Sequence, residues 1–304
     1  MFRLAVVADN RSDDWCYRLA ARFADVAIEK FVENLSGTVS DSAEAIAEQL
    51  SRFDAVWVSS SKHSSQISPV AAQAGKHLIV DSRVALSAAN LDTLQDAVAA
   101  GGAQCVIASS LRYLPGIQVV KEQLDSGNLG EPGLLRIHHW HAWEHDRDSS
   151  AKSLPAELSD QIDLGCWLFD GMPTHVYARR QSLDYVQLHL GFPNGGMALI
   201  DAWRSKQTGP GYFSLSLIGS SGAAYADDHH NMQLMFHDGP ITALRTEQEH
   251  LAAKNQIEDL LAAVQEQREA NRSFDRARQL LNVVAAVQES LENDQAVAME
   301  KRES

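Results

Sequence analysis

The chain has 304 residues and a mass of 33.3 kDa, with a formal net charge of −14 and a pI near 5.2. An acidic surface repels phosphate backbones and anionic headgroups, which argues against nucleic-acid partners and membrane surfaces. No run approaches the roughly 20 apolar residues that span a bilayer, and the N-terminal apolar run is too short for a signal peptide. We therefore expect a cytoplasmic protein long enough for two domains.

The first third of the sequence alternates short apolar runs with helical stretches, which is typical of βαβ units around a parallel sheet. The expected strands are 3–8, 26–32, 55–59, 77–80 and 104–108. The expected helices are 14–23, 42–52, 69–74 and 91–100. This pattern predicts an α/β domain over residues 1–110.

After Ser110 the pattern changes to longer strands with alternating apolar residues. The expected strands are 134–143, 174–180, 182–192, 196–204, 212–219 and 223–227, and the expected helices are 114–126, 160–169, 255–269 and 274–292. Strands of this kind predict an open, predominantly antiparallel sheet with one face covered by helices. The predicted fold class is thus α/β plus α+β, with the α+β domain over residues 111–304.

Cys16, Cys105 and Cys166 are widely spaced and odd in number. Their spacing matches neither a zinc-binding motif nor a disulfide framework. We expect each to be a small core residue in a reducing compartment, and we expect no metal site.

Four segments carry motifs in a fixed order. They are AAQAGKHLIVDSRVALS at 71–87, LRYLPGIQVVKEQLDSGNLGEPG at 111–133, DQIDLGCWLFDG at 160–171 and LIGSSGA at 217–223. In order and spacing they resemble the Gfo/Idh/MocA family of oxidoreductases, and the last two helices also fit. The resemblance implies an N-terminal Rossmann domain that binds NAD or NADP and a C-terminal domain whose open sheet face forms a homo-oligomer, a dimer or tetramer. It places a sugar-like or polyol substrate between the domains.

The glycine-rich loop of a Rossmann domain is replaced in this chain. Its three glycines let the backbone approach the pyrophosphate, and the corresponding residues are Ala8, Asn10 and Asp13, with Asp9 between them. Two like charges about 5 Å apart repel by roughly 1 kcal/mol in water, so carboxylates here oppose a pyrophosphate. If a dinucleotide binds, Ala8, Asp9 and Asn10 would line it. A structural loop in which Asp13 or Asp14 caps the following helix is the favoured alternative.

Further cofactor candidates follow the third expected strand, where the family places the nicotinamide ribose. They are Ser59, Ser61 and His63. The small hydroxyl groups can approach a ribose, but the same residues also suit a polar loop without a ligand. Either Glu29 or Glu33 would hold the adenosine ribose, and the sequence does not decide between them.

The family's catalytic lysine and histidine are replaced as well. Its EKP motif is Asp81-Ser82-Arg83 here, so Ser82 stands where the lysine would supply a cation. Arg83 is too basic to exchange protons near neutral pH, although it could bind a carboxylate or phosphate. The histidine expected seven residues before Trp167 is Asp160, which is ionised at neutral pH unless its pKa is raised.

The remaining candidates would contact substrate. Asp163 matches an aspartate of the family motif and could meet a substrate hydroxyl, and Arg112 and Tyr113 belong to the motif after the first domain. His139 and His141 share one face of an expected strand. We expect these histidines to contact a ligand, with a metal site or a plain sheet surface as alternatives.

Replacement of the glycine loop, the lysine and the histidine leaves more than one hypothesis about function. The first is an NAD(P)-dependent oxidoreductase that acts on a sugar or polyol-like substrate with weak or lost dehydrogenase activity. The second is a non-catalytic family member used for ligand binding, assembly or regulation. A third is lyase- or hydrolase-like use of the cleft through Asp160 and the histidines.

Overall fold

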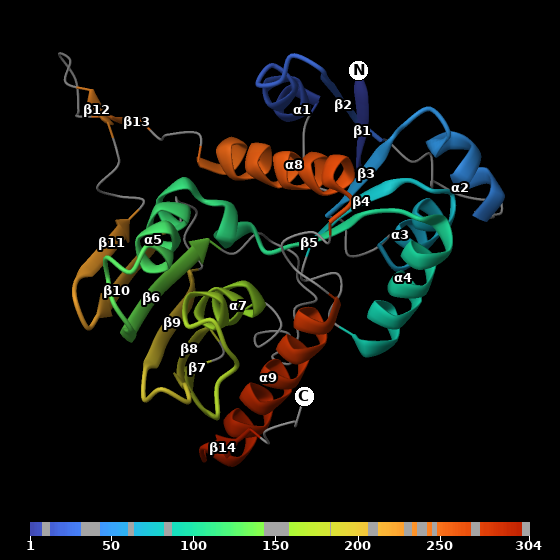
Figure 1. The fold of residues 1–304 in the computed structure, drawn as a ribbon. Helices are drawn as coiled ribbons and strands as arrows, with labels where there is room; N and C mark the ends of the chain where they lie inside the picture. Colours follow the sequence, from blue (N-terminus) through green and yellow to red (C-terminus); the bar gives the residue numbers. More distant parts are fainter. Residues whose placement is uncertain are drawn as a thin grey trace. The chain divides into compact units, whose positions relative to one another are not determined.

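The computed structural model of the chain divides into two units, each with its own sheet (Figure 1). The structure describes residues 1–7, 13–31, 43–59, 64–81, 87–142, 158–182, 184–205, 212–227, 233–235, 242–244, 248–268 and 274–299. The first unit comprises Met1–Tyr113 and Glu249–Leu281, and the second comprises Leu114–Gln248 and Asn282–Ser304. The chain therefore returns to the first unit at Glu249 and enters the second unit again at Asn282.

Among the described residues, five parallel strands form the sheet of the first unit, in the order β2-β1-β3-β4-β5. They are β1 (Phe2–Val7), β2 (Val26–Lys30), β3 (Ala55–Val58), β4 (His77–Asp81) and β5 (Cys105–Ala108). Continuous apolar runs such as Ala-Val-Trp-Val in β3 suit strands that are buried on both faces. The chain order reverses between β1 and β3, and α/β sheets bind ligands beside the carboxyl ends of the strands at such a switch point.

Helices cover both faces of this five-stranded sheet. The helices between the strands are α1 (Asp13–Ala20), α2 (Ala43–Leu50), α3 (Ser64–Gln73) and α4 (Ala88–Gly101). One core joins Val56 and Val58 of β3 to α2, α3, α4 and to Ala277 at the start of α9 (Phe274–Asn293). On the other face Trp57 of β3 meets Trp15 of α1.

The helix α8 (Gln248–Glu266) belongs to the first unit, although most strands of the second unit precede it in the chain. Its His250 ring lies 5.4 Å from the Trp15 ring, and both side chains are buried. The two C-terminal helices expected from the sequence therefore differ in the units to which they belong. Helix α8 packs with α1 in the first unit, whereas α9 begins in the first unit and ends in the second.

The family-like segment between α3 and β4 is held by tight packing. Gly75 adopts φ +73°, a left-handed conformation that favours glycine. At the end of α4, a Cβ placed on Gly101 would lie 1.8 Å from the carbonyl oxygen of Ala72. Because the backbones of α3 and α4 meet at this point, only glycine fits there.

His77 opens β4 as a neutral, hydrogen-bonded side chain. Its Nδ1 accepts a hydrogen bond of 3.0 Å from the N–H of Gln104. Burial lowers the pKa of His77 below its ordinary value of 6.5, Asp54 opposes this by raising it, and Lys76 lowers it slightly further. The histidine of this motif is thus a structural link between β4 and the start of β5.

Within the described part of the second unit, seven strands form a sheet in the order β11-β10-β6-β9-β8-β7-β14. They are β6 (Pro132–Ala142), β7 (His175–Ser182), β8 (Tyr185–Gly191), β9 (Met197–Ser205), β10 (Tyr212–Gly219), β11 (Ala223–Asp227) and β14 (Val297–Ala298). Of the described strand pairs in this sheet, β6 and β9 are parallel and the others antiparallel. The predicted open and mostly antiparallel sheet is confirmed. A separate hairpin pairs β12 (Gln233–Met235) with β13 (Thr242–Leu244).

Among the described residues, three helices cover one face of this seven-stranded sheet: α5 (Pro115–Asp125), α7 (Ser159–Leu168) and the second half of α9 (Figure 1). Gly165 of α7 lies in contact with Ala198 of β9, at 3.6 Å from the position its Cβ would take. Ser290 of α9 accepts a hydrogen bond of 2.9 Å from the N–H of Ala178 in β7. The alternation of buried and exposed residues along the strands follows from this one-sided cover.

Two of the family-like motifs meet in the second unit. The N–H of Ser220 donates to the carbonyl oxygen of Glu131 at 2.9 Å, and the N–H of Glu131 donates to Ser220 Oγ at 3.0 Å. A Cβ on Gly219 would lie 2.1 Å from the carbonyl oxygen of Leu129, and one on Gly130 would lie 2.2 Å from Ser220 Oγ. The glycines of both motifs therefore allow two turns to pack closely against each other, which is a structural role.

The face of the same sheet that no described helix covers carries an aromatic group that we call the open-face cluster: Trp140, Trp203, Tyr212, Asp201 and His138. The Trp140 ring lies 6.1 Å from Trp203 and 5.1 Å from Tyr212. Its Nε1 donates to Asp201 Oδ2 at 3.1 Å, and Asp201 also pairs with His138. Both tryptophans are 40% exposed, so large aromatic rings face outward on this sheet.

The three cysteines are core residues. Cys16, Cys105 and Cys166 are buried and form no disulfide, and burial raises the pKa of Cys105 to about 12. The expectation of core residues is confirmed.

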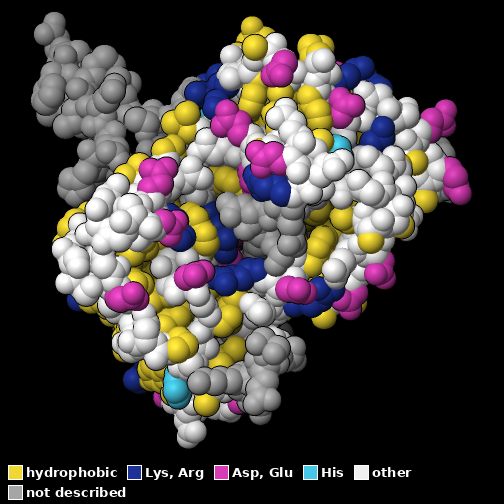
Figure 2. All heavy atoms as spheres, viewed as in Figure 1, with side chains coloured by type: hydrophobic (Ala, Val, Ile, Leu, Met, Phe, Trp, Pro, Cys, Tyr) yellow, Lys and Arg dark blue, Asp and Glu magenta, His cyan; other side chains and the backbone are white. Residues whose placement is uncertain are grey.

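Figure 2 shows Lys and Arg side chains interspersed with Asp and Glu over the face drawn. No helix in the described ranges is long and apolar enough to cross a membrane.

Candidate functional site

The first candidate set lies at the carboxyl edge of the five-stranded sheet. Ser59 follows β3 and its N–H donates to the carbonyl oxygen of Val7 at 2.9 Å, so it joins the two strands at the switch point. Asp81 ends β4, and both Ser59 and Asp81 are half-buried. Several predicted site residues lie outside the described residues: Ala8, Asp9, Asn10, Ser61, His63, Ser82 and Arg83.

Acidic residues occupy the start of α1, the helix that would face a pyrophosphate. Asp13 and Asp14 are its first two helical residues, where the helix dipole stabilises negative charge. Asp14 pairs with Arg18 one turn later, at 2.9 Å. The two carboxylates thus lie inside the first turn, not at the capping position that precedes it, and they compete with an anion for the same end of the helix.

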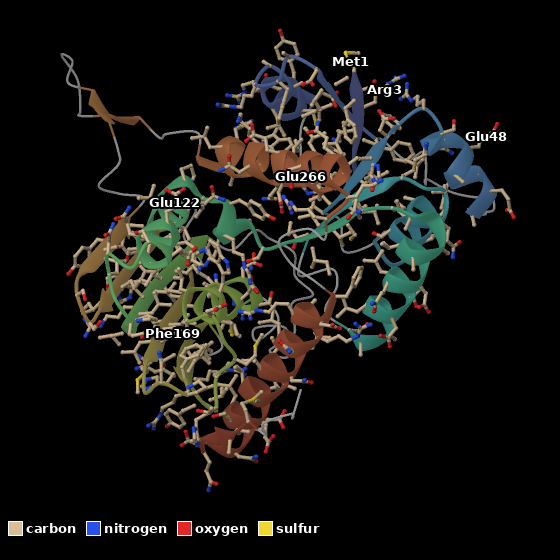
Figure 3. The ribbon with its side chains drawn as sticks, viewed as in Figure 1. Met1, Arg3, Glu48, Glu122, Phe169 and Glu266 are labelled. Atoms are coloured by element: carbon tan, nitrogen blue, oxygen red, sulfur yellow. The ribbon has the colours of Figure 1, made fainter. Side chains whose placement is uncertain are left out.

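Glu29 is engaged by two arginines. Arg3, labelled in Figure 3, and Arg52 each place Nη2 3.1 Å from a carboxylate oxygen of Glu29. Both guanidinium groups lie over the Phe53 ring, at 5.7 and 4.7 Å from its centroid. Glu29 therefore belongs to a salt-bridge cluster on the side of the sheet that α2 covers, and a ribose would have to displace these partners. Glu33, the other candidate, lies outside the described residues.

The residues that follow β5 are bound to α8. Arg112 and Tyr113 lie in a short 3₁₀ helix (Ser110–Tyr113) and both are buried. The Tyr113 hydroxyl donates to Asp259 Oδ2 at 2.8 Å, and its carbonyl oxygen accepts from Asn255 Nδ2 at 2.9 Å. Arg268 donates to the other oxygen of Asp259 at 3.0 Å. The Tyr113 hydroxyl is thus committed to holding α8 within the first unit.

The second candidate set lies in the second unit, where α7 packs on the end of β6. Asp160 is half-buried and Asp163 fully buried, and their spacing of three places them on one side of the helix. Between them Gln161 binds His139 of β6 through its Nε2 and the imidazole Nδ1. The His139 ring also lies edge-on to Phe213 of β10, at 5.8 Å. Asp160, Asp163 and His139 were expected at a site, whereas Gln161 was not.

Polar groups are concentrated at this end of the covered sheet face. Ser159 and Gln161 are at most 2% exposed, and within the described part of the chain Ser159 Oγ and Gln161 Oε1 have no hydrogen-bond partner. Arg204 of β9 is 5% exposed and lies 3.7 Å from Asp184. His141 pairs with Arg204 through the backbone, and its side chain is outside the described residues. Among the residues that are described, no three His, Cys, Asp or Glu side chains are placed to hold a metal ion.

Sequence comparisons relate part of the chain to known proteins. The GFO/IDH/MocA C-terminal domain matches residues 117–225. The uncharacterised oxidoreductase YrbE of Bacillus subtilis (strain 168) is 27% identical over 197 residues, which cover 58% of this chain and 56% of that protein. The match therefore spans little more than half the length of this relative.

Solved structures extend the similarity to the whole fold. Scyllo-inositol dehydrogenase from Lactobacillus casei, with bound NAD(H) and scyllo-inositol, has a TM-score of 0.75 at 16% identity over 98% of both chains. A myo-inositol dehydrogenase from Corynebacterium glutamicum ATCC 13032 has a TM-score of 0.76 at 15% identity over 99% of both chains. The chain thus has the same fold as these two inositol dehydrogenases. Residues 117–225 are thus similar to the C-terminal domain of the Gfo/Idh/MocA family, and part of the chain is similar to one curated oxidoreductase.

Proposed function

We infer that the chain is a diverged cytoplasmic NAD(P)-dependent oxidoreductase that acts on a sugar or polyol-like substrate more slowly than its relatives. The observation that carries the proposal is that both candidate sets are present: the switch-point edge in the first unit, and the polar cluster on α7 and β6 in the second. The inositol dehydrogenases with this fold support the choice of substrate class. Divergence is supported by the replaced lysine and histidine positions, Ser82 and Asp160.

The residues of the first unit fit a dinucleotide in part. The reversal of strand order at β1 and β3 provides the usual place, and Ser59 offers a half-buried hydroxyl there. Ser61, His63 and the loop from Ala8 to Asn10 would complete the contacts. Dinucleotide binding is weakened because Glu29 is already paired with two arginines and because α1 begins with two aspartates. When bound, the nicotinamide ring accepts or donates a hydride.

The residues of the second unit supply acceptors for substrate hydroxyls. Carboxylates accept hydrogen bonds from hydroxyl groups, so Asp160 and Asp163 suit a polyol. Arg83, Arg112 and the histidines at 139 and 141 would contact other substrate groups. An aspartate is a weak proton acceptor at neutral pH, and Ser82 supplies no cation to polarise the substrate oxygen, which is why we propose slow turnover.

Self-association through the open-face cluster belongs to the same proposal. Exposed aromatic side chains such as Trp140, Trp203 and Tyr212 are typical of interaction surfaces. In the described ranges, the helices of this unit cover only the other face of the sheet. A dimer or tetramer of this chain would cover them.

A non-catalytic role in ligand binding, assembly or regulation is the second candidate. The specific observation in its favour is the salt-bridge cluster of Glu29 with Arg3 and Arg52, which removes one acceptor that a dinucleotide ribose would use. This alternative implies binding of a sugar-like ligand without turnover.

Turnover by the purified full-length protein tests the proposal. Inositols and common sugars are each incubated with NAD⁺ or NADP⁺, and reduced nicotinamide is followed by its absorbance. We expect slow oxidation of at least one compound, and loss of this activity in Asp163→Asn. The matched variant Asp96→Asn, on the exposed surface of α4, keeps it. Complete inactivity of the folded protein with every pair contradicts the proposal and favours the non-catalytic role.

A further inference from the structure

We propose that Gln161 positions His139 as the proton donor and acceptor of the second unit, in place of the histidine that its relatives carry where this chain has Asp160. This inference rests on the proposed oxidoreductase function. The starting observation is the contact between Gln161 Nε2 and His139 Nδ1, which joins the first turn of α7 to the end of β6. Neither residue matches a functional position of the family motifs.

The direction of the His139 side chain follows from the strand. Leu135 and Ile137 of β6 are fully buried beneath the helices, and His139 has the same parity along the strand. His138 has the opposite parity and pairs with Asp201 in the open-face cluster. Two adjacent histidines thus have separate surroundings, and only His139 lies with the polar groups of α7.

A glutamine amide is suited to a histidine that changes its protonation state. When Nδ1 is unprotonated, the Gln161 Nε2–H group donates to it, as in the structure. When Nδ1 carries a proton, a half-turn of the amide lets Oε1 accept from it. That Oε1 atom is buried and has no hydrogen-bond partner in the described ranges, so the amide can turn without breaking a described hydrogen bond of Oε1. Gln161 can therefore satisfy either form of the imidazole, whereas a carboxylate at this position would favour the charged form.

Charged side chains lie on the same helix as Gln161 and on the strand next to β6. Asp160 and Asp163 flank Gln161 on α7, and Arg204 lies on the neighbouring strand β9 with Asp184 beside it. Phe213 closes the β10 side of the imidazole. In the oxidation of an alcohol, the base form of His139 would take the hydroxyl proton, and the protonated form would return it in the reverse direction.

Nuclear magnetic resonance tests the positioning directly, without any need for turnover. The full-length protein is labelled with ¹⁵N-histidine, and the His139 signals are assigned by their absence in His139→Gln. We expect His139 to titrate in the neutral range, and Gln161→Glu to raise its pKa by about 1 unit or more because a carboxylate favours the charged ring. The control Gln181→Glu adds the same charge at an exposed end of β7, three strands or about 14 Å away. It should leave the titration unchanged.

A His139 that does not titrate in this range, or whose pKa ignores Gln161→Glu, overturns the inference. The second measurement is the pH profile of kcat/KM for polyol oxidation. Gln161→Glu should move the acidic limb to higher pH by the same amount as the His139 pKa, and His139→Gln should remove that limb. Failure of the proposed function appears in the unmodified protein as no turnover at all. Failure of this inference appears as turnover whose pH profile neither variant changes.

Discussion

The motif resemblance aligns Asp160 with a histidine and Ser82 with a lysine of the Gfo/Idh/MocA pattern, and our proposal for the chemistry depends on these two side chains. A carboxylate that is ionised at neutral pH accepts protons poorly, and a serine cannot stabilise a developing negative charge on oxygen. The structure adds a neighbour with better proton affinity, because His139 lies beside Gln161, the residue after Asp160.

The double variant Ser82→Lys with Asp160→His should restore activity. General acid–base catalysis contributes typically 10²- to 10⁴-fold, so we expect kcat to rise by about 10²-fold on any polyol that the unmodified protein oxidises. Steady-state kinetics measure the change, with Ser126→Lys and Asp96→His, both on exposed helix ends or surfaces, as the matched control pair. A folded double variant that binds dinucleotide yet is no faster than the parent would contradict the assignment of these positions.

The candidate site was partly predictable at this scale. Alternation along β6 predicted that His139 faces a different side from its neighbours, and the motif resemblance made Asp160 and Asp163 candidates, which the structure places on α7 with Gln161 between them. Gln161 could not be found this way, because its contact joins residues 22 apart in sequence and a single amide carries no pattern. The partners of Glu29 were equally hidden, since Arg3 and Arg52 reach it from another strand and from the end of a helix.

Helices and strands were predicted well where their apolar patterns were long. β10 and β11 occupy the ranges expected from alternation. The strands β12, β13 and β14 have only two or three residues, too few to show a period. The parallel pairing of β6 with β9 was also missed, because strand neighbours far apart in sequence depend on the whole sheet and not on either strand.

His77 should make the first unit sensitive to acid. Its pKa in the folded protein is lowered below 6.5, so the unfolded chain binds a proton more readily than the folded one. The stabilising contribution is complete above pH 6.5 and is lost as the pH falls through the lower folded pKa. Urea unfolding at several pH values should show a steeper loss of stability below pH 6.5 in the parent than in His77→Gln. The exposed His175→Gln should behave like the parent, and equal slopes in all three would refute this role.

Gly101 and Gly116 offer a matched pair of glycines within helices. A Cβ on Gly101 would lie 1.8 Å from the Ala72 carbonyl oxygen, whereas one on Gly116 would lie 3.6 Å from Ala226 Cβ. Alanine favours a helix by up to about 1 kcal/mol over glycine, so Gly116→Ala should be neutral or slightly stabilising. Gly101→Ala should lower the free energy of unfolding by about 2–3 kcal/mol, because the backbones of α3 and α4 must separate. Urea denaturation compares the two, and an equally tolerated Gly101→Ala would show that these helices do not meet so closely.

At the scale of the molecule, the open-face cluster on the seven-stranded sheet is an exposed aromatic surface among the described residues. The Trp140 ring contacts both Trp203 and Tyr212 and donates to Asp201, and an exposed aromatic patch of this kind favours association. Trp203→Glu should dissociate the expected homo-oligomer to species of 33.3 kDa in sedimentation experiments. Tyr17→Glu, at a 74% exposed aromatic residue of α1, should not. A parent protein that already sediments as a monomer would contradict the interface.

Dinucleotide binding is the most direct measure of whether this chain still works as an oxidoreductase. The purified protein is titrated by calorimetry with NAD⁺, NADH, NADP⁺ and NADPH. Because the fold keeps its switch point but Glu29 is paired and α1 begins with two aspartates, we predict binding of at least one of them. The expected Kd is about 10 µM to 1 mM, or roughly −6.8 to −4.1 kcal/mol. No heat with any of the four, from protein shown to be folded, would contradict the oxidoreductase proposal and leave a ligand-binding or assembly role.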